Sequence, residues 1–171
     1  MYSDFYPNNA AAIAYIQGGP LAPDLCGVVY FNPVPGGTCV TVEVQGLPAY
    51  RPATETTPQI GPHGFHIHEN GTCAVGNEND PFTAAGSHWN PTKQPHGNHA
   101  GDFPALFSNN GYAYMSFFTD KFTVDQIIGK SIIIHQSPDD YKSQPAGDSG
   151  KRLACGVIQW GWNTDCDCQF Y

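Results

Sequence analysis

The sequence predicts an all-β domain, folded as a sandwich or a barrel. Several short segments are rich in Val, Ile, Tyr and Phe, and Gly, Pro, Asn or Asp bounds most of them, as is typical of strands joined by turns. The 171 residues include 19 glycines and 15 prolines, a composition that favours many turns over long helices. The predicted strands cover residues 13–17, 27–31, 39–45, 64–68, 112–118 and 130–135.

Local patterns support several of these elements in turn. In 39–45, three valines alternate with Thr41 and Glu43, which is the period of two expected of a half-buried strand. Residues 32–37, which are Asn, Pro, Val, Pro and two glycines, lie between two predicted strands and indicate a hairpin connection. Residues 122–128 form the one stretch that favours a helical turn, with Thr123 as its cap.

Three long stretches, 48–62, 69–104 and 136–151, are predicted to be loops. The loop 69–104 holds most of the candidate metal-binding residues, and a loop of this length in a small domain is usually functional. We expect a single domain over 1–171, with a core of about 11–160, an N-terminal lead of 1–10 and a C-terminal tail of 161–171.

Charge and hydropathy narrow the possible functions. Seven Lys and Arg against fifteen Asp and Glu give a formal net charge of −8, which disfavours nucleic acid as a partner because phosphate binding needs clustered cations. The chain has no run of 18 apolar residues, so we expect no membrane span. Residues 1–20 have neither a basic segment nor a long apolar stretch, so we expect no signal peptide in this chain.

The six cysteines are an even number, which favours an oxidising compartment, extracytoplasmic or secreted, over the cytoplasm. Cys26 and Cys39 flank the predicted hairpin and can form a cross-strand bridge. Cys166 and Cys168 are too close together for an easy disulfide with each other. They can pair elsewhere in the chain, pair between chains, or capture a soft metal.

Histidines are concentrated in two parts of the sequence. In HGFHIH at 63–68, strand periodicity places His66 and His68 on one face, opposite Phe65 and Ile67. Two imidazoles at positions i and i+2 can share one cation, whereas the alternative is a histidine-bearing face open to solvent. His135 ends the predicted strand 130–135 and, taken alone, is more simply explained as a strand-end histidine.

The second group, in the loop 88–102, offers three imidazoles and one carboxylate, which fits a closed tetrahedral zinc site. Its members are His88, His96, His99 and Asp102. Gly97 and Gly101 allow the backbone to turn so that these side chains converge. The alternative is a polar surface loop whose side chains cap turns.

Five blocks of sequence, in this order, resemble the copper/zinc superoxide dismutases. They are HGFHIH at 63–68, GSHWNP at 86–91, HGNHAGD at 96–102, IIIHQSPDD at 132–140 and GKRLACGVI at 150–158. The resemblance spans about residues 13–159, and the loop 136–151 looks more like the bacterial branch. It implies an immunoglobulin-like Greek-key β-sandwich, or flattened barrel, with long metal-binding loops.

The resemblance also implies copper and zinc as cofactors. The residues that resemble copper ligands are His66, His68, His88 and His135, and those that resemble zinc ligands are His88, His96, His99 and Asp102. Asp139 resembles the carboxylate that hydrogen-bonds one ligand of each metal, whereas the alternative is a turn-forming aspartate after Pro138. Only two residues separate His96 from His99, fewer than in better-known members.

The implied activity is disproportionation of superoxide, a small anion, to dioxygen and hydrogen peroxide by a cycling copper beside a structural zinc. His88 and Arg152 would be catalytic, with the Arg152 guanidinium pairing with the anion, and Lys142 and Lys151 are candidates for steering. A matched pair of cysteines, Cys73 and Cys155, resembles the family's intrasubunit disulfide, which the chain-entropy model values at about 4–5 kcal/mol.

The sequence leaves two alternative functions and one possible assembly beside this interpretation. The first alternative is a non-catalytic dismutase-like domain that binds metal or serves a structural role, although such relatives typically lose a copper ligand or the arginine. The second is a zinc hydrolase, which needs an open zinc position that the four-residue zinc set does not leave. A homodimer is a possible assembly.

Overall fold

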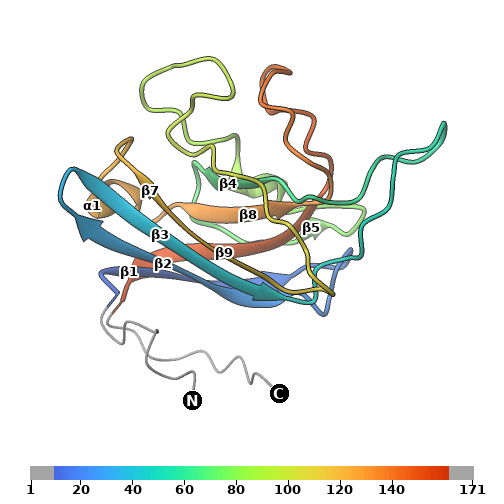
Figure 1. The fold of residues 1–171 in the computed structure, drawn as a ribbon, viewed down its shortest axis with the longest axis horizontal. Coiled ribbons are helices and arrows are strands. Elements are labelled where there is room, and N and C mark those ends of the chain that lie inside the picture. Colours follow the sequence, from blue (N-terminus) through green and yellow to red (C-terminus); the bar gives the residue numbers. More distant parts are fainter. Residues whose placement is uncertain (1–9, 162–171) are drawn as a thin grey trace.

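The computed structural model describes residues 10–161, which form a curled seven-stranded antiparallel sheet in the order β4-β8-β9-β1-β2-β3-β7 (Figure 1). Its strands are β1 (Ala12–Gly18), β2 (Cys26–Val34), β3 (Gly37–Gln45), β4 (Phe65–His68), β7 (Ala113–Thr119), β8 (Ser131–His135) and β9 (Arg152–Trp160). The short elements are β5 (Gly76–Asn77), β6 (Asp80–Pro81), the 3-10 turn η1 (Thr83–Ala85) and α1 (Val124–Ile127). The all-β prediction is confirmed.

Each of the six predicted strands overlaps an observed one, and the predicted helical turn is α1, where Thr123 caps the helix in a capping box with Gln126. The pattern analysis missed β9. This strand lies between β8 and β1 in the sheet and is buried on both faces from Leu153 to Gly156, so its sequence lacks the alternation of a half-buried strand. No helix among residues 10–161 is long and apolar enough to cross a membrane.

The main core fills the inside of the curled sheet. Its fully buried members include Phe31 and Val42 from the hairpin side and Phe65, Ile67 and Ile134 from β4 and β8. Because side chains alternate along a strand, the residues between them on β4 and β8 point to the opposite face. That opposite face is not open to solvent, since long loops cover it.

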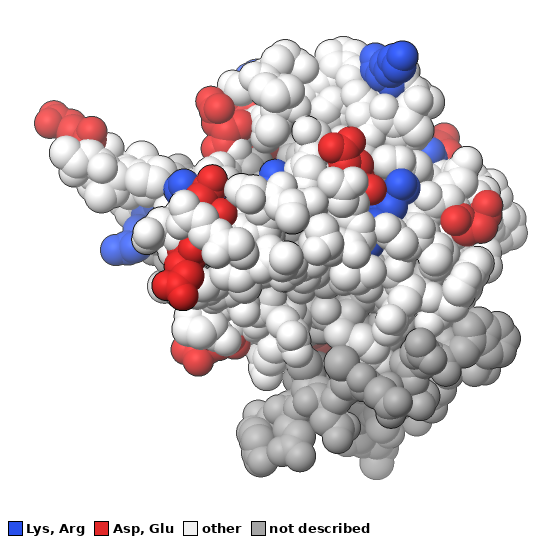
Figure 2. All heavy atoms as spheres, turned by 180° about the vertical axis from the view of Figure 1, so that it is seen from behind, with Lys and Arg blue, Asp and Glu red and all other residues white. Residues whose placement is uncertain are grey.

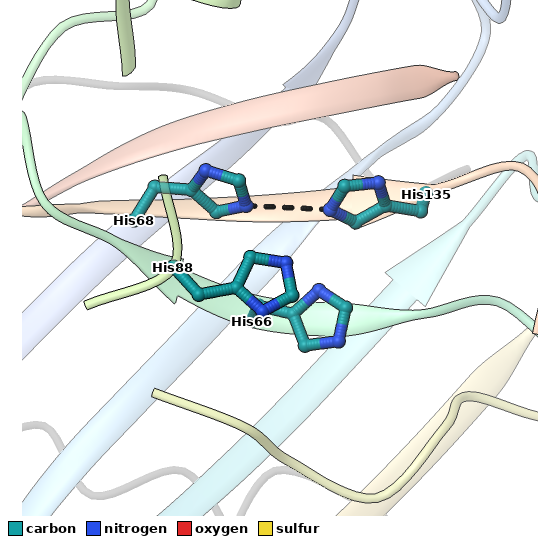
Figure 3. A group of neighbouring side chains, drawn as sticks. All are labelled: His66, His68, His88 and His135. Atoms are coloured by element: carbon teal, nitrogen blue, oxygen red, sulfur yellow. Dashed lines mark hydrogen bonds between the residues drawn. The ribbon is translucent and has the colours of Figure 1, made fainter. Parts of the chain in front are cut away.

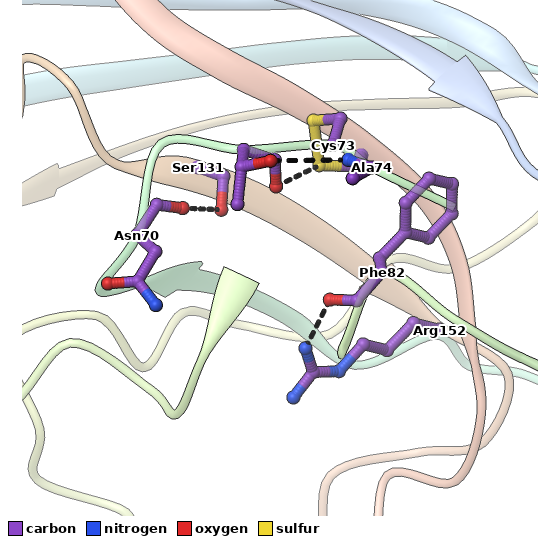
Figure 4. Close-up of a disulfide and its surroundings, with 8 residues drawn as sticks. Asn70, Cys73, Ala74, Phe82, Ser131 and Arg152 are labelled. Carbon is purple, nitrogen blue, oxygen red and sulfur yellow. Dashed lines mark hydrogen bonds between the residues drawn. A yellow bond between two sulfur atoms is a disulfide. The ribbon is translucent and has the colours of Figure 1, made fainter. Parts of the chain in front are cut away.

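One of the covering loops, residues 69–86, is fastened to β8 and β9 (Figure 4). Cys73 forms a disulfide with Cys155 in β9, and the Ser131 hydroxyl donates to the Asn70 carbonyl at 2.8 Å. Phe82 packs in a second small apolar cluster with Ile133 and Cys155. The loop is thereby held by a covalent bond, a hydrogen bond and apolar contact.

Two more loops, around residues 89–101 and 136–151, rise on the same side of the sheet above β4 and β8 (Figure 1). They contact each other, because the backbone N–H of His96 donates to the Gln144 side chain at 2.8 Å. The cover over the outer face of β4 and β8 is therefore built from segments far apart in the sequence.

The structure overturns the suggested bridge between Cys26 and Cys39, which are both free thiols. In the β2–β3 hairpin, Cys26 lies opposite Gln45, whereas Cys39 lies opposite Asn32. The two cysteines therefore sit at opposite ends of the hairpin, too far apart for a disulfide. Cys166 and Cys168 lie outside the described residues.

Candidate metal centre

The candidate centre lies on the outer face of β4 and β8. Phe65 and Ile67 are fully buried in the main core, so His66 and His68 point to the other face, as strand periodicity predicts. The solvent-exposed alternative is excluded, because His66 and His68 are only 0% and 1% exposed beneath the loops.

Backbone pairing at the edge of β4 brings the second group of candidates to the same place. The Trp89 N–H donates to the Ile67 carbonyl at 2.8 Å, and the Ile67 N–H donates to the Gly101 carbonyl at 2.9 Å. Residues 88 and 102 therefore lie beside β4, where they form isolated bridges with residues 68 and 66. A Cβ on Gly101 would lie 2.5 Å from the Ile67 carbonyl oxygen, so Gly101 is needed for this close approach.

Four imidazoles from β4, β8 and the loop converge in one group (Figure 3). One ring nitrogen of each lies within 4.8 Å of those of the others, and all four residues are buried: His66, His68, His88 and His135. The rings of His66 and His88 have centroids 3.9 Å apart, and the Nε2 atoms of His68 and His135 face each other at 3.3 Å. His135, which alone would be explained as a strand-end histidine, is thus part of a cluster.

Hydrogen bonds at the far side of these rings show which nitrogens are free to bind a cation. His68 Nδ1–H donates to the Gly86 carbonyl at 2.9 Å, and His135 Nδ1–H donates to the Gly150 carbonyl at 3.3 Å. Both Nε2 atoms are then unprotonated in the neutral rings, so two lone pairs face each other. Two facing lone pairs with no proton between them form a suitable binding site for a cation.

Burial keeps three of these rings neutral, those of His66, His68 and His135. Burial, followed by the neighbouring histidines, holds the pKa of His66 and His68 well below the ordinary value, and burial together with His88 lowers the pKa of His135 to about 3. His66 Nδ1 and His88 Nε2 are buried without a hydrogen-bond partner. Neutral imidazoles with unsatisfied nitrogens are the form of histidine that metals bind.

A second group shares His88 with the first. Its ligand atoms also lie within 4.8 Å of one another and belong to His88, His96, His99 and Asp102. The Nδ1 atoms of the three histidines lie 3.0, 3.3 and 3.3 Å from the Asp102 carboxylate oxygens. The three nitrogens and one carboxylate suit zinc, whereas the four imidazoles of the first group suit copper.

The short spacing between His96 and His99 is accommodated by a turn that Asp102 completes. Asp102 Oδ2 accepts the backbone N–H groups of Gly97 and His99, both at 2.9 Å. Burial alone would raise the pKa of Asp102, but hydrogen bonds from His88 and from the His99 backbone hold it well below its usual range. The carboxylate is therefore ionised, as a metal ligand must be.

Asp139 links the two groups. Its Oδ2 accepts from His66 Nε2 at 2.7 Å, and its Oδ1 accepts from His96 Nε2 at 2.8 Å. Oδ1 also accepts the Tyr141 backbone N–H at 2.7 Å, so Asp139 forms a local turn as well. Both interpretations of this residue from the sequence describe contacts that the structure contains, and the carboxylate fixes the orientation of one ring in each group.

Gly147 leaves the space in which Asp139 meets His96. A Cβ at this position would lie 2.0 Å from Asp139 Oδ1 and 2.5 Å from His96 Nε2. The residue also has a φ of 68°, which glycine adopts without strain. We predict that Gly147→Ala breaks this hydrogen bond and weakens zinc binding about 10–100-fold, as loss of such an outer partner typically does.

Zinc affinity measured against a competing chelator checks this prediction. Gly76→Ala is the matched control, because Gly76 has a similar φ of 63° and open space where the Cβ would be. The control should keep zinc affinity while incurring the same backbone strain. Equal zinc affinities for the two variants would show that the contact with Asp139 is unimportant.

Arg152 begins β9 and is oriented by main-chain carbonyls of the disulfide-bound loop (Figure 4). Nη1 donates to the Phe82 carbonyl at 2.6 Å and Nη2 donates to the Gly86 carbonyl at 2.7 Å. The Gly86 carbonyl also accepts from His68, so it connects Arg152 to the four-imidazole group. Burial lowers the pKa of Arg152, yet a guanidinium stays charged.

Arg152, His68, His88 and His135 line a half-open cavity of about 510 Å³. The charged residues of its lining are Arg152, Glu69 and Asp148, so positive charge is local to the arginine. Neither Lys142 nor Lys151, the steering candidates, lines the cavity, and Lys151 pairs with Asp80 at 2.9 Å. On the face drawn in Figure 2, cationic and acidic side chains are scattered over a largely uncharged surface, some of them side by side.

Several contributors to the site were not predicted from the sequence. The carbonyls of Phe82 and Gly86 are main-chain groups, which carry no residue-specific pattern. Gly147 has no local feature that distinguishes it from other loop glycines, and Tyr141 and Gln144 act through contacts with distant segments.

Comparisons with known proteins agree with this geometry. The family model described as copper/zinc superoxide dismutase matches residues 25–158. A Cu-Zn superoxide dismutase of Deinococcus radiodurans is 38% identical over 150 residues, which cover 78% of this chain and 76% of that protein. One of Photobacterium leiognathi is 41% identical over 121 residues, 60% of this chain and 70% of that protein.

A solved structure is also similar. The Cu/Zn superoxide dismutase from Brucella abortus superposes with a TM-score of 0.69 at 30% identity and covers 86% of this chain and 99% of that one. The likeness therefore extends over nearly the whole of the solved chain.

Proposed function

The chain belongs to the copper/zinc superoxide dismutase family, and on that premise we propose which of its residues carry the activity. It is a superoxide dismutase with copper and zinc as cofactors. We assign copper to the four-imidazole group and zinc to the group completed by Asp102, with His88 shared between them. The observation that carries this assignment is the convergence of two sets of ligand atoms, each set lying within 4.8 Å of one another, that share His88.

The reaction consumes two superoxide ions and two protons and yields one dioxygen and one hydrogen peroxide. Bound copper supplies the one-electron exchange, and zinc supplies fixed positive charge without redox chemistry. The protein has to bind an anion, orient it and deliver protons in a cavity that water also reaches.

Arg152 binds the anion in this proposal. Two carbonyls fix its guanidinium at the cavity that His68 and His135 also line, so little side-chain freedom is lost when superoxide pairs with it. The net charge of −8 and the two carboxylates of the lining repel anions. The attraction must therefore come from Arg152 and the bound cations at short range.

His88 holds and moves a proton at Nε2. This atom is buried without a partner on the side of the four-imidazole group, while Nδ1 lies 3.0 Å from Asp102. An imidazole nitrogen can hold and release a proton, which suits the second half of the reaction, where the reduced oxygen species needs protons. Nδ1 would bind zinc beside Asp102, so that side of the ring would stay in place while Nε2 gains or loses its proton.

The compartment and the assembly are also proposals. The Cys73–Cys155 disulfide persists in an oxidising environment, which supports an extracytoplasmic or secreted protein. We also propose a homodimer.

Metal loading tests the proposed function. Protein loaded with copper and zinc should hold one of each per chain and disproportionate superoxide, whereas zinc-only protein should be inactive. Anomalous scattering at the two absorption edges should place the two ions on either side of the His88 ring. A single occupied centre after full loading, or two metals without dismutation, would favour the non-catalytic metal-binding alternative.

A further inference from the structure

Tyr141 attaches the segment 136–151 to the stretch of chain that follows Asp102. Its hydroxyl donates to the Phe103 carbonyl at 3.1 Å and accepts the Ala105 N–H at 2.9 Å. One hydroxyl thus satisfies a main-chain acceptor and a main-chain donor two residues apart. Tyr141 is also one of the non-glycine residues with a positive φ, 56°, a backbone conformation that persists only where its surroundings enforce it.

Gln144 attaches the same segment, 136–151, to the main chain of His96. Its side-chain Oε1 accepts the His96 N–H at 2.8 Å, and its Nε2 donates to the His96 carbonyl at 3.3 Å. The side-chain amide therefore pairs with both main-chain groups of a zinc-site histidine. The ring of the same histidine donates to Asp139, which lies in the segment 136–151 as well.

We propose that Tyr141 and Gln144 are positioning residues that fasten the cavity wall to the zinc loop and hold Asp139 between His66 and His96. The Tyr141 hydroxyl hydrogen-bonds to the chain after Asp102, and the Gln144 amide hydrogen-bonds to the main chain of His96. The backbone N–H of Tyr141 donates to Asp139. Gln144, Asp148 and Ser149 belong to the cavity wall, so the same contacts set the wall against the zinc site. The inference rests on the zinc ligands proposed above.

The consequence is that zinc retention depends on two side chains that do not touch the metal. Loss of the Tyr141 hydroxyl leaves the Phe103 carbonyl and the Ala105 N–H without this partner, and loss of the Gln144 amide does the same to the main chain of His96. Hydrogen bonds of this kind typically contribute enough to change an equilibrium severalfold each. Two of them acting on one ligand loop are expected to change zinc release about tenfold.

The test compares Tyr141→Phe and Gln144→Met with a matched control in the protein loaded with both metals. Tyr112→Phe is the control, because Tyr112 is 42% exposed like Tyr141 and its hydroxyl also makes a hydrogen bond, to Glu43 on the sheet at 3.0 Å. We expect zinc transfer to a chelator to be about tenfold faster in either variant. Copper transfer should be accelerated less, since it is affected only through Asp139 and His66, and the melting temperature should stay close to that of the control.

Two further readouts report on position rather than on stability. The His96 and Ala105 amides should exchange with deuterium faster in Gln144→Met and Tyr141→Phe respectively. With Co(II) in place of zinc, the visible bands of the variants should shift, while those of Tyr112→Phe should match the parent protein.

The outcomes separate this inference from the function on which it rests. A parent protein that binds no zinc contradicts the ligand assignment. A parent protein that binds zinc, together with variants that release it at the parent rate and show unchanged Co(II) bands, contradicts the positioning role alone. Equal acceleration of copper and zinc release would also overturn it, because it would indicate general loosening.

Discussion

Replacing Arg152 by glutamate is expected to lower the second-order rate with superoxide at least about a hundredfold while copper and zinc contents stay unchanged. Removal of one fixed donor to a reacting anion costs about 10²–10³ in rate, and a carboxylate adds repulsion in a cavity that already has Glu69 and Asp148 in its lining. Arg152 supplies no ligand atom to either metal group, so occupancy should be kept.

Pulse radiolysis for the rate and elemental analysis for the metals check this prediction. Arg152→Gln separates the loss of attraction from added repulsion, because its side chain is uncharged. Its rate with superoxide should lie between those of the parent protein and Arg152→Glu. If Arg152→Glu disproportionates superoxide at the parent rate with both metals bound, the arginine has no part in the reaction.

His88→Ala is expected to abolish dismutation below detection. This residue alone belongs to both ligand groups among the residues that the structure describes, so each group is reduced to three side chains by one substitution. Affinity for both metals should fall at least about a hundredfold, and the proton-carrying Nε2 is lost as well. Thr92→Ala, an exposed substitution in the same loop, serves as the control and should keep metals and activity.

Equilibrium dialysis against copper and zinc, followed by the Cu(II) electron paramagnetic resonance spectrum, measures the effect. In the parent protein that spectrum should change when zinc is removed, because one ring joins the two sites. In His88→Ala it should respond to zinc far less, because only Asp139 still links the two groups. Retention of full activity by this variant would refute the shared-imidazole assignment.

The sequence predicted much of this centre because histidine pairs and loop clusters carry strong chemical information. The alternation in HGFHIH placed His66 and His68 on one face, and the structure has them there. The dense group from His88 to Asp102 indicated a metal loop, and its ligand atoms do converge. Arg152 and Asp139 were named through the family resemblance rather than through any local pattern.

What the sequence did not predict depends on long-range geometry. Strand β9 has no alternation because both of its faces are covered, and the loop that covers one of them is placed by the Cys73–Cys155 disulfide. The hydroxyl of Tyr141 finds its partners 36 and 38 residues away, a separation that no periodicity encodes. Cys26 and Cys39 flank the hairpin in the sequence, which suggested a disulfide, but the strand register puts them at opposite ends of the hairpin.

The carboxylate of Asp139, with one oxygen on His66 and the other on His96, has a thermodynamic consequence. A single rigid group that orients a ring in each pocket makes the two occupancies interdependent, and such interdependence is reciprocal for equilibrium binding. The factor by which an ion in one pocket raises the binding affinity of the other pocket must equal the factor for the reverse effect. Chelation of the inert ion alone should therefore loosen the redox-active one by the same ratio.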